Sequence, residues 1–439
     1  MKKNILLQKF TFKPALAILF CILLFAGSVE AQTKISAQSG NISGTTTENQ
    51  IDLWEDVGSA ISFTGLSADD KILVLSTFEG TVTSGNSDMV CQYRLSDGTT
   101  NSPTIQRYVA QKTYDDHGLG AVSNLFTATG ASHSYKLQHS KGTGGASKQF
   151  TTEAVIVGLV INETNVDLPN SQKSTGDVTT TSTDYVQVTG TKTDIITLTK
   201  PGGIYLTTSF STFGSEALIG YYVLRSSSDG TNFTNITDAD ITRTNSTNPG
   251  AATISILLED QPAGSYYFDV AHKTSTGTLT TRNLSLSVVG LVDATGLVFQ
   301  TFKSTVETIN NATTSFTTAA SNTITSLNGT NEVFLNSTFN MSSASIVDPA
   351  AFKLFSSAGT FTSQTLERYV PAGGTGSGGL VGLVTGLSAN TNYTLELQHQ
   401  STGVTLTTSN INLVGFQLTS SPIFEFTQTT SVVSLKYIY

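Results

Sequence analysis

One long pattern of residues occurs three times along this chain. Each copy has a strand-like segment that ends on a histidine, then a polar hairpin, then an apolar segment with an internal glycine. The histidines are His139, His272 and His399. Their spacing of about 130 residues corresponds to a whole domain, because solenoid repeats are only about 20–50 residues long. The sequence therefore predicts three tandem domains rather than a solenoid.

Further segments recur in step with the histidines. Apolar and polar residues alternate in Lys71–Phe78, Gly203–Phe210 and Glu332–Phe339, and again in Cys91–Leu95, Tyr221–Leu224 and Ala351–Leu354. Period-two alternation, with almost no helical periodicity, indicates β-strands. The second set runs into Asp-Gly turns at Asp97-Gly98 and Asp229-Gly230, which are hairpin signals. We expect an all-β chain of three tandem antiparallel β-sandwich domains, jelly-roll-like in type.

The repeats set the expected domain limits. A signal peptide would cover residues 1–31, the three sandwiches 40–162, 174–293 and 303–418, and a C-terminal β tail 419–439. The linkers Asn162–Thr175 and Asp293–Thr305 are short and polar. They predict domains arranged as beads on a fairly stiff rod.

The first 31 residues have the features of a secretory signal. Four lysines precede a short apolar run, Ala15–Ala26, and Val29-Glu30-Ala31 supplies small residues at a cleavage site. No later stretch is apolar for the roughly 18 residues that a membrane span needs. We therefore expect an extracellular or cell-surface protein, without excluding the periplasm, whose mature chain is not inserted in a membrane.

Charge and cysteine content narrow the possible partners. The formal net charge is −9, and removal of the signal peptide, which carries +3, would make it −12. Such an acidic surface argues against nucleic acid, whose phosphates need lysine and arginine. Cys91 would be the one remaining cysteine, so no intrachain disulfide is expected. Its place in an apolar strand indicates a small buried side chain.

The C-terminal tail matches the stretches that lead from one repeat into the next. It continues from Phe424 to Tyr439 and has the pattern of an incomplete fourth repeat. An apolar strand such as Val432–Tyr439 invites association if its edge is left open. It could fold back on the third domain, donate a strand to another molecule, or serve as an export signal.

The second domain resembles a known family. Pro201-Gly202-Gly203-Ile204-Tyr205 is similar to the Pro-Gly-x-Tyr strand of C1q- and tumour-necrosis-factor-like jelly rolls. Gln261–Phe268 and Ser285–Leu291 resemble their later turn and closing strand. The resemblance implies a non-enzymatic jelly roll whose relatives form trimers and bind partners, although three tandem domains could instead pack within one chain. Separately, Tyr222–Ile236 is similar to a hairpin of discoidin-type carbohydrate-binding modules.

Chemistry-bearing residues give no catalytic pattern. The repeated histidines share strand parity with core residues, so we interpret them as hydrogen-bonded core or edge residues. One histidine per domain falls short of the three or four ligands of a zinc site. The glutamates do not recur at matched positions, and no nucleotide-binding or hydrolase motif is present. We predict no enzyme activity, no catalytic residues, no metal and no cofactor.

A repeated arginine is the best sequence candidate for a binding site. Arg107, Arg243 and Arg368 occupy one position in the three copies, and Tyr108 and Tyr369 follow two of them. Arginine beside an aromatic ring can stack on a sugar or hold a carboxylate, and it can equally form a cross-strand ion pair.

Function follows from these features only in outline. We expect a binding or adhesion protein that contacts a glycan or protein ligand through loops, with repetition raising avidity. The alternative is a structural subunit of a fibre, sheath or layer that assembles through strand edges and the tail. A homo-oligomer is possible on either hypothesis.

Overall fold

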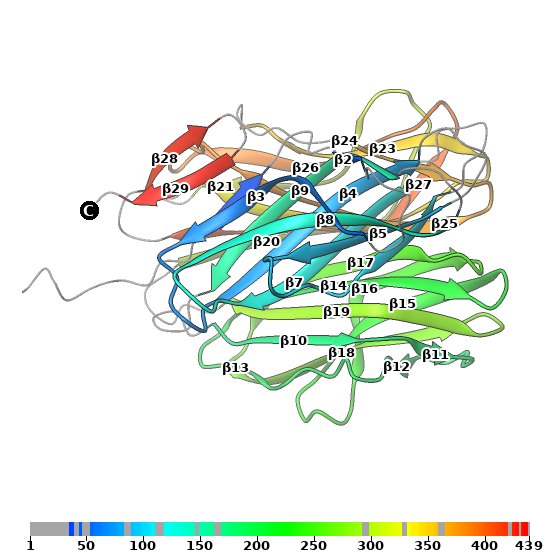
Figure 1. Ribbon diagram of the computed structural model, residues 1–439, viewed down its shortest axis with the longest axis horizontal. Coiled ribbons are helices and arrows are strands. Elements are labelled where there is room, and N and C mark those ends of the chain that lie inside the picture. The colour runs from blue at the N-terminus through cyan, green and yellow to red at the C-terminus, as the bar shows by residue number, and fades with distance from the viewer. Residues whose placement is uncertain are drawn as a thin grey trace, which may run out of the picture.

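The computed structural model describes residues 35–38, 44–45, 53–82, 89–109, 118–144, 149–161, 168–291, 298–326, 332–358, 365–419, 424–429 and 432–437. The predicted signal peptide lies outside this part of the chain. Every named element within it is a β-strand, so the predicted all-β antiparallel class is confirmed (Figure 1).

Each repeat forms two antiparallel sheets of its own. We call the sheet that faces the other two repeats the inner sheet, and the sheet that faces away from them the outer sheet. In the first repeat the inner sheet has the order β1-β9-β4-β7 and the outer sheet the order β3-β8-β5-β6. A short strand, β2 (Gly44–Thr45), pairs with β9. The bounds are β1 Ile35–Gln38, β3 Glu55–Thr64, β4 Lys71–Val82, β5 Met89–Ser96, β6 Ile105–Val109, β7 Gly118–Thr127, β8 Ser132–Gly144 and β9 Gln149–Ile161.

The other two repeats have the same strand order. Their inner sheets are β10-β19-β14-β17 and β20-β27-β22-β25, and their outer sheets are β12-β18-β15-β16 and β21-β26-β23-β24. In the second repeat the short strands β11 and β13 extend the pairing of β19 and β18. The bounds in the second repeat are β10 Asn170–Thr175, β11 Val178–Thr180, β12 Val186–Gln187, β13 Ile196–Leu198, β14 Gly202–Gly214, β15 Leu218–Ser227, β16 Thr234–Asn245, β17 Gly250–Gln261, β18 Gly264–Thr274 and β19 Leu279–Leu291. Those in the third are β20 Val298–Asn311, β21 Thr317–Thr325, β22 Val333–Ser342, β23 Val347–Ser356, β24 Thr365–Val370, β25 Thr375–Val384, β26 Asn392–Gln400 and β27 Leu406–Thr419.

This order defines the architecture of each repeat. Leaving the short extra strands aside, the inner sheet contains the first, eighth, third and sixth strands, and the outer sheet the second, seventh, fourth and fifth. Two four-stranded sheets connected in this way form a jelly roll.

Side chains that alternate inward from the two sheets fill each sandwich. In the first repeat the rings of Phe78 and Tyr93 stack with their centroids 3.6 Å apart. The glycine inside the last strand has a packing reason, because a Cβ on Gly158 would lie 2.7 Å from the ring of Phe63. The Cys91 side chain is fully buried, as its strand predicted.

The three sandwiches do not form the predicted rod. The segments expected to be linkers contribute β10 and β20, each of which pairs along the last strand of its own sandwich. One hydrophobic cluster contains residues of all three repeats, among them Leu75, Leu206 and Phe416. In Figure 1 the repeats lie against one another with their inner sheets together. The prediction of a rod was wrong because the inner sheets present apolar and small polar faces to one another rather than to water.

The C-terminal tail forms a hairpin, β28 (Phe424–Thr429) and β29 (Val432–Tyr437). Strand β29 pairs with β1, with Val433 opposite Ala37, and so extends the inner sheet of the first repeat. The hypothesis that the tail folds back on the third domain was therefore wrong about the domain, because β1 offers the available sheet edge.

Candidate functional site

The three repeats meet through one contact made three times. At each interface a backbone N–H of one repeat donates a hydrogen bond to a side-chain oxygen of the next. The donor is always the residue before the repeated arginine. The acceptor is always the residue after the phenylalanine that ends the first matched strand pattern, namely Phe78, Phe210 or Phe339. The pairs are Gln106 N–H to Ser211 Oγ at 2.6 Å, Thr242 N–H to Asn340 Oδ1 at 3.3 Å, and Glu367 N–H to Glu79 Oε2 at 2.6 Å. The first repeat contacts the second, the second the third, and the third the first, so the chain forms a closed pseudo-three-fold unit.

A second set of contacts lies closer to the pseudo-three-fold axis. Ser123 N–H donates to Ser209 Oγ at 3.1 Å, and the equivalent Ser255 N–H donates to Thr338 Oγ1 at 3.1 Å. At the third interface the equivalent hydroxyl belongs to Thr77, and its buried Oγ1 has no hydrogen-bond partner in the described part of the chain. This second set of hydrogen bonds is thus formed at two interfaces and, among the described residues, not at the third.

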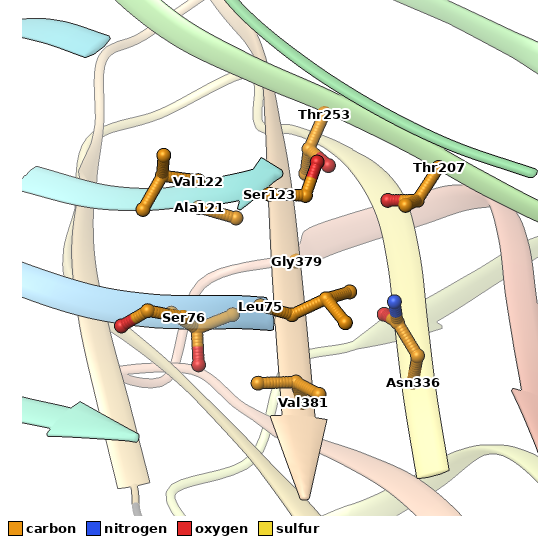
Figure 2. Close-up of a pocket in the computed structure, with 11 residues that line it drawn as sticks. Leu75, Ser76, Ala121, Val122, Ser123, Thr207, Thr253, Asn336, Gly379 and Val381 are labelled. Atoms are coloured by element: carbon orange, nitrogen blue, oxygen red, sulfur yellow. The ribbon is translucent and has the colours of Figure 1, made fainter. Parts of the chain in front are cut away.

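A small pocket lies where this third bond is not made. Figure 2 shows its lining side chains grouped between strands of all three repeats. Equivalent positions on the three inner sheets supply Leu75, Thr207 and Asn336. Asn336 donates to Tyr205 Oη at 2.6 Å and to Ser255 Oγ at 3.2 Å. The space is about the size of one water molecule, so the axis is a packed junction rather than a substrate pocket.

The third interface also differs in charge. Glu79 stands where the other interfaces have Ser211 and Asn340, and it lies opposite Glu153 on β9. Burial, together with the charges of Glu79 and Glu367, raises the pKa of Glu153 to about 7. A carboxyl group with a raised pKa therefore lies at the contact between the third and first repeats.

The repeated histidines lie in the three cores. Each has no exposed surface, and its Nδ1 is hydrogen-bonded to the Oγ1 of a threonine on the neighbouring inner sheet. The pairs are His139–Thr151 at 2.8 Å, His272–Thr281 at 2.8 Å and His399–Thr408 at 2.7 Å. Burial lowers the pKa of each histidine to about 4. The predicted core position is confirmed, but full hydrogen bonding was wrong, because no Nε2 has a partner among the described residues.

The repeated arginines are turned into the protein. Arg107, Arg243 and Arg368 are 7%, 7% and 4% exposed. Arg243 Nη1 donates to the carbonyl of Ala251 at 3.0 Å, and Arg368 Nη1 donates to the equivalent carbonyl of Ser377. Burial, reinforced by the nearby Arg107, lowers the pKa of Arg243 to about 9.

Each of these arginines packs against a glycine of the neighbouring inner strand: Gly118, Gly250 and Gly376. Tyr108 and Tyr369, the other predicted binding residues, are half-buried, and Tyr108 N–H donates to the Pro249 carbonyl of the second repeat at 2.8 Å. The structure gives these five residues places in the domains and their junctions, and their role toward a ligand stays a prediction.

A different triplicated set lies on the outer sheets, and the sequence analysis missed it. The residue before the cross-strand partner of each histidine is aromatic and half-exposed, and a cation from another strand of the same outer sheet covers its ring. Arg94 and Lys353 come from the strand beyond the adjacent one, and Lys273 comes from the adjacent strand. The pairs are Trp54 with Arg94 at 4.0 Å from the ring centroid, Tyr185 with Lys273 at 4.6 Å, and Phe316 with Lys353 at 4.1 Å. None of the three cations has a carboxylate within ion-pair distance in the part of the chain that the structure describes.

Two residues after each aromatic side chain comes a polar one with a matched cross-strand partner. The partner is always the residue three before the repeated histidine. The pairs are Asp56 with Lys136, Gln187 with Asp269 at 2.9 Å, and Thr318 with Glu396 at 3.0 Å. Each outer sheet therefore carries an aromatic ring, a cation and a hydrogen-bonded polar pair. We call each such group of side chains a row.

These aromatic residues were hidden for simple reasons. They are a tryptophan, a tyrosine and a phenylalanine, so no residue type repeats. Their separation along the chain from Phe78, Phe210 and Phe339 differs in every copy, so the spacing is not constant either. The signal that could have found them is the presence of any aromatic residue near that spacing in every copy.

Within the described ranges, no three side chains of His, Cys, Asp or Glu lie close enough to hold a metal ion. No helix long and apolar enough to cross a membrane is found among these residues.

Comparison with known proteins gives only remote likenesses. No protein-family model matches the chain, and no curated protein matches it. Among solved structures, the Eiger TNF of S. frugiperda is 13% identical, with a TM-score of 0.21, over 29% of this chain and 94% of that one. A CBM22 tandem domain of Paenibacillus barcinonensis Xyn10C is 12% identical, with a TM-score of 0.19, over 59% and 94%. A triple-jelly-roll protein of an archaeal virus is also 12% identical, with a TM-score of 0.19, over 90% and 93%.

Proposed function

We propose that this chain is a non-enzymatic, multivalent binding protein of the cell exterior. The observation that carries the proposal is the closed pseudo-three-fold unit, which displays the same outer-sheet surface three times. The location follows from the expected signal peptide at residues 1–31.

The use of the repeated polar residues supports binding rather than catalysis. The three histidines bond threonines in the cores, and Arg243 and Arg368 bond backbone carbonyls within their own repeats. A general base must be able to reach a substrate, and groups buried in this way cannot. The groups left at the surface in triplicate are aromatic rings and cations, which suit recognition.

The arrangement of the repeats determines how the sites would act. In Figure 1, β12 and β18 lie along the lower side of the molecule and β23 and β24 along the upper side, so the outer sheets face different directions. Three sites that diverge cannot close on one small ligand. They can bridge separate strands or particles, and the gain in avidity then depends on ligand density.

Bead agglutination tests this proposal directly. The purified chain, without residues 1–31, is mixed with beads that carry polysaccharides or extracellular proteins. We expect a monomeric chain to agglutinate beads of at least one kind, and agglutination to rise steeply with ligand density. Binding without agglutination would contradict multivalency. No binding to any bead, or turnover of a polysaccharide or ester, would contradict the proposed function.

A further inference from the structure

Resting on this binding function, the structure also indicates what is bound and where. The aromatic residues Trp54, Tyr185 and Phe316 share one position, immediately before the edge strand of each outer sheet. All three are half-exposed, although their sequence neighbours differ completely. The sandwich cores do not need an aromatic side chain there, because these positions point away from the buried histidines.

The cation above each ring contributes little to the fold. A cation–π pair at an exposed site stabilises by about 0.5–1 kcal/mol. The edge strands already have their backbone pairing with β8, β18 and β26. A ligand can therefore displace the cation from the ring at small cost, and the displaced side chain remains close enough to donate hydrogen bonds to that ligand.

The chemistry of the row fits a sugar ring. An aromatic face is weakly negative and packs against the C–H face of a pyranose. Sugar hydroxyls both donate and accept, and the row offers both kinds of partner. Arg94 and Lys353 supply donors, and Asp56 and Glu396 supply carboxylate acceptors. In the second repeat Lys273 lies near two rings, those of Tyr185 and Tyr221.

Charge selects a neutral ligand. The formal net charge of the chain is −9, and the loss of residues 1–31 makes it more negative. The carboxylates of the first two rows are already paired, Asp56 with Lys136 and the buried Asp269 with Arg225, so they add no excess of negative charge. The negative charge of the chain as a whole repels a polyanion. Hydroxyl groups carry no charge and are not repelled.

We propose that Trp54, Tyr185 and Phe316, with Arg94, Lys273 and Lys353, form three surface sites of the same kind for a neutral polysaccharide. Each site binds one short segment weakly, and the pseudo-three-fold unit cross-links separate polysaccharide chains.

The test measures retention of the intact chain on immobilised cellulose, xylan, mannan and starch, with polygalacturonate as the anionic comparison. The triple variant Trp54→Leu, Tyr185→Leu, Phe316→Leu keeps apolar bulk and removes the rings. The matched control is Phe233→Leu, which removes a half-exposed ring that Arg225 approaches at 5.4 Å in a hairpin outside the triplicated position. Circular dichroism and thermal unfolding show whether each variant is folded.

We expect retention on at least one neutral polymer, weakened by about tenfold or more in the triple variant and unchanged in the control. A second triple variant, Arg94→Gln, Lys273→Gln, Lys353→Gln, keeps the rings and should also bind more weakly. Wild-type binding by the folded ring variant would overturn the inference, and so would retention on polygalacturonate alone. Binding to immobilised proteins but to no polysaccharide would overturn this inference and leave the proposed function standing. Binding to neither would overturn both.

Discussion

The buried histidines make folding stability depend on pH in a way that a single substitution can isolate. His272 has no exposed surface, and burial lowers its pKa from about 6.5 to about 4. The unfolded chain then takes up a proton more readily than the folded one. The stabilisation is complete above pH 6.5 and is lost as the pH falls toward 4.

The magnitude follows from the size of the shift. A difference of about two and a half pKa units corresponds to about 3 kcal/mol below pH 4, and about 2 kcal/mol of it is already lost at pH 5. His272→Gln can keep a hydrogen bond to Thr281 Oγ1 and cannot titrate. The free energy of unfolding of the variant should therefore respond less than that of the wild type, by about 2 kcal/mol, to a change from pH 8 to pH 5.

Urea unfolding at the two pH values measures this double difference. Glu153 and Glu332 have raised pKa values, about 7 and about 8, and so make the folded state more stable as the pH falls. Their opposite effect is present in both proteins and cancels in the comparison. Equal pH sensitivity of variant and wild type would refute the reasoning, because it would mean that His272 is protonated in the fold.

Three further perturbations test other contacts. Glu153→Gln should raise the free energy of unfolding at pH 8 relative to pH 5 by about 1–2 kcal/mol. This is less than the full pKa shift implies, because the side chain is partly exposed. An unchanged dependence of stability on pH would contradict the charged contact between the third and first repeats. Gly250→Ala places a Cβ against the buried Arg243 guanidinium and should cost about 1–3 kcal/mol in urea unfolding. The control Gly264→Ala, whose Cβ would meet nothing nearer than 3.8 Å, should stay within about 0.5 kcal/mol of the wild type, and equal losses would dismiss the steric argument. Deletion of residues 420–439 should leave the light-scattering mass at one chain, as in the full-length protein, because β29 pairs with β1 of the same chain; assembly that depends on the tail would instead favour the structural-subunit alternative.

The strands themselves could be predicted from the sequence. Alternation within Lys71–Phe78 and its two equivalents identified β4, β14 and β22, and the histidine landmarks identified β8, β18 and β26. Local pattern is sufficient here because each strand has one face in a core, and the burial of that face imposes period two.

The packing of the repeats could not be predicted, because small hydroxyl side chains have the same sequence pattern whether they face water or another domain. Ser209 and Thr338 lie on strand faces that alternation assigns to solvent, yet each hydroxyl is buried against a backbone N–H of a neighbouring repeat. Hydrogen bonds to a neighbouring backbone replace those to water, so the composition is unchanged.

The burial of the repeated arginines could not be predicted for a related reason. A charged side chain such as Arg243 is expected at the surface, but Gly250, a little further along the chain, leaves room for its guanidinium inside the repeat. A glycine follows the other two arginines as well, at Gly118 and Gly376. The exposed triplicated position carries Trp54, Tyr185 and Phe316 instead, and only the strand register aligns them with the histidines.

Small-angle X-ray scattering of the chain without residues 1–31 tests the closed three-fold unit most directly. A compact body of that length has a radius of gyration of about 22 Å, whereas three sandwiches in a row, spaced by about 35 Å, would give about 32 Å. We expect the compact value, unchanged with protein concentration, because the inner sheets of the three repeats pack against one another. The larger value would show separated domains and would contradict the closed unit, and with it the three-directional display of the proposed sites.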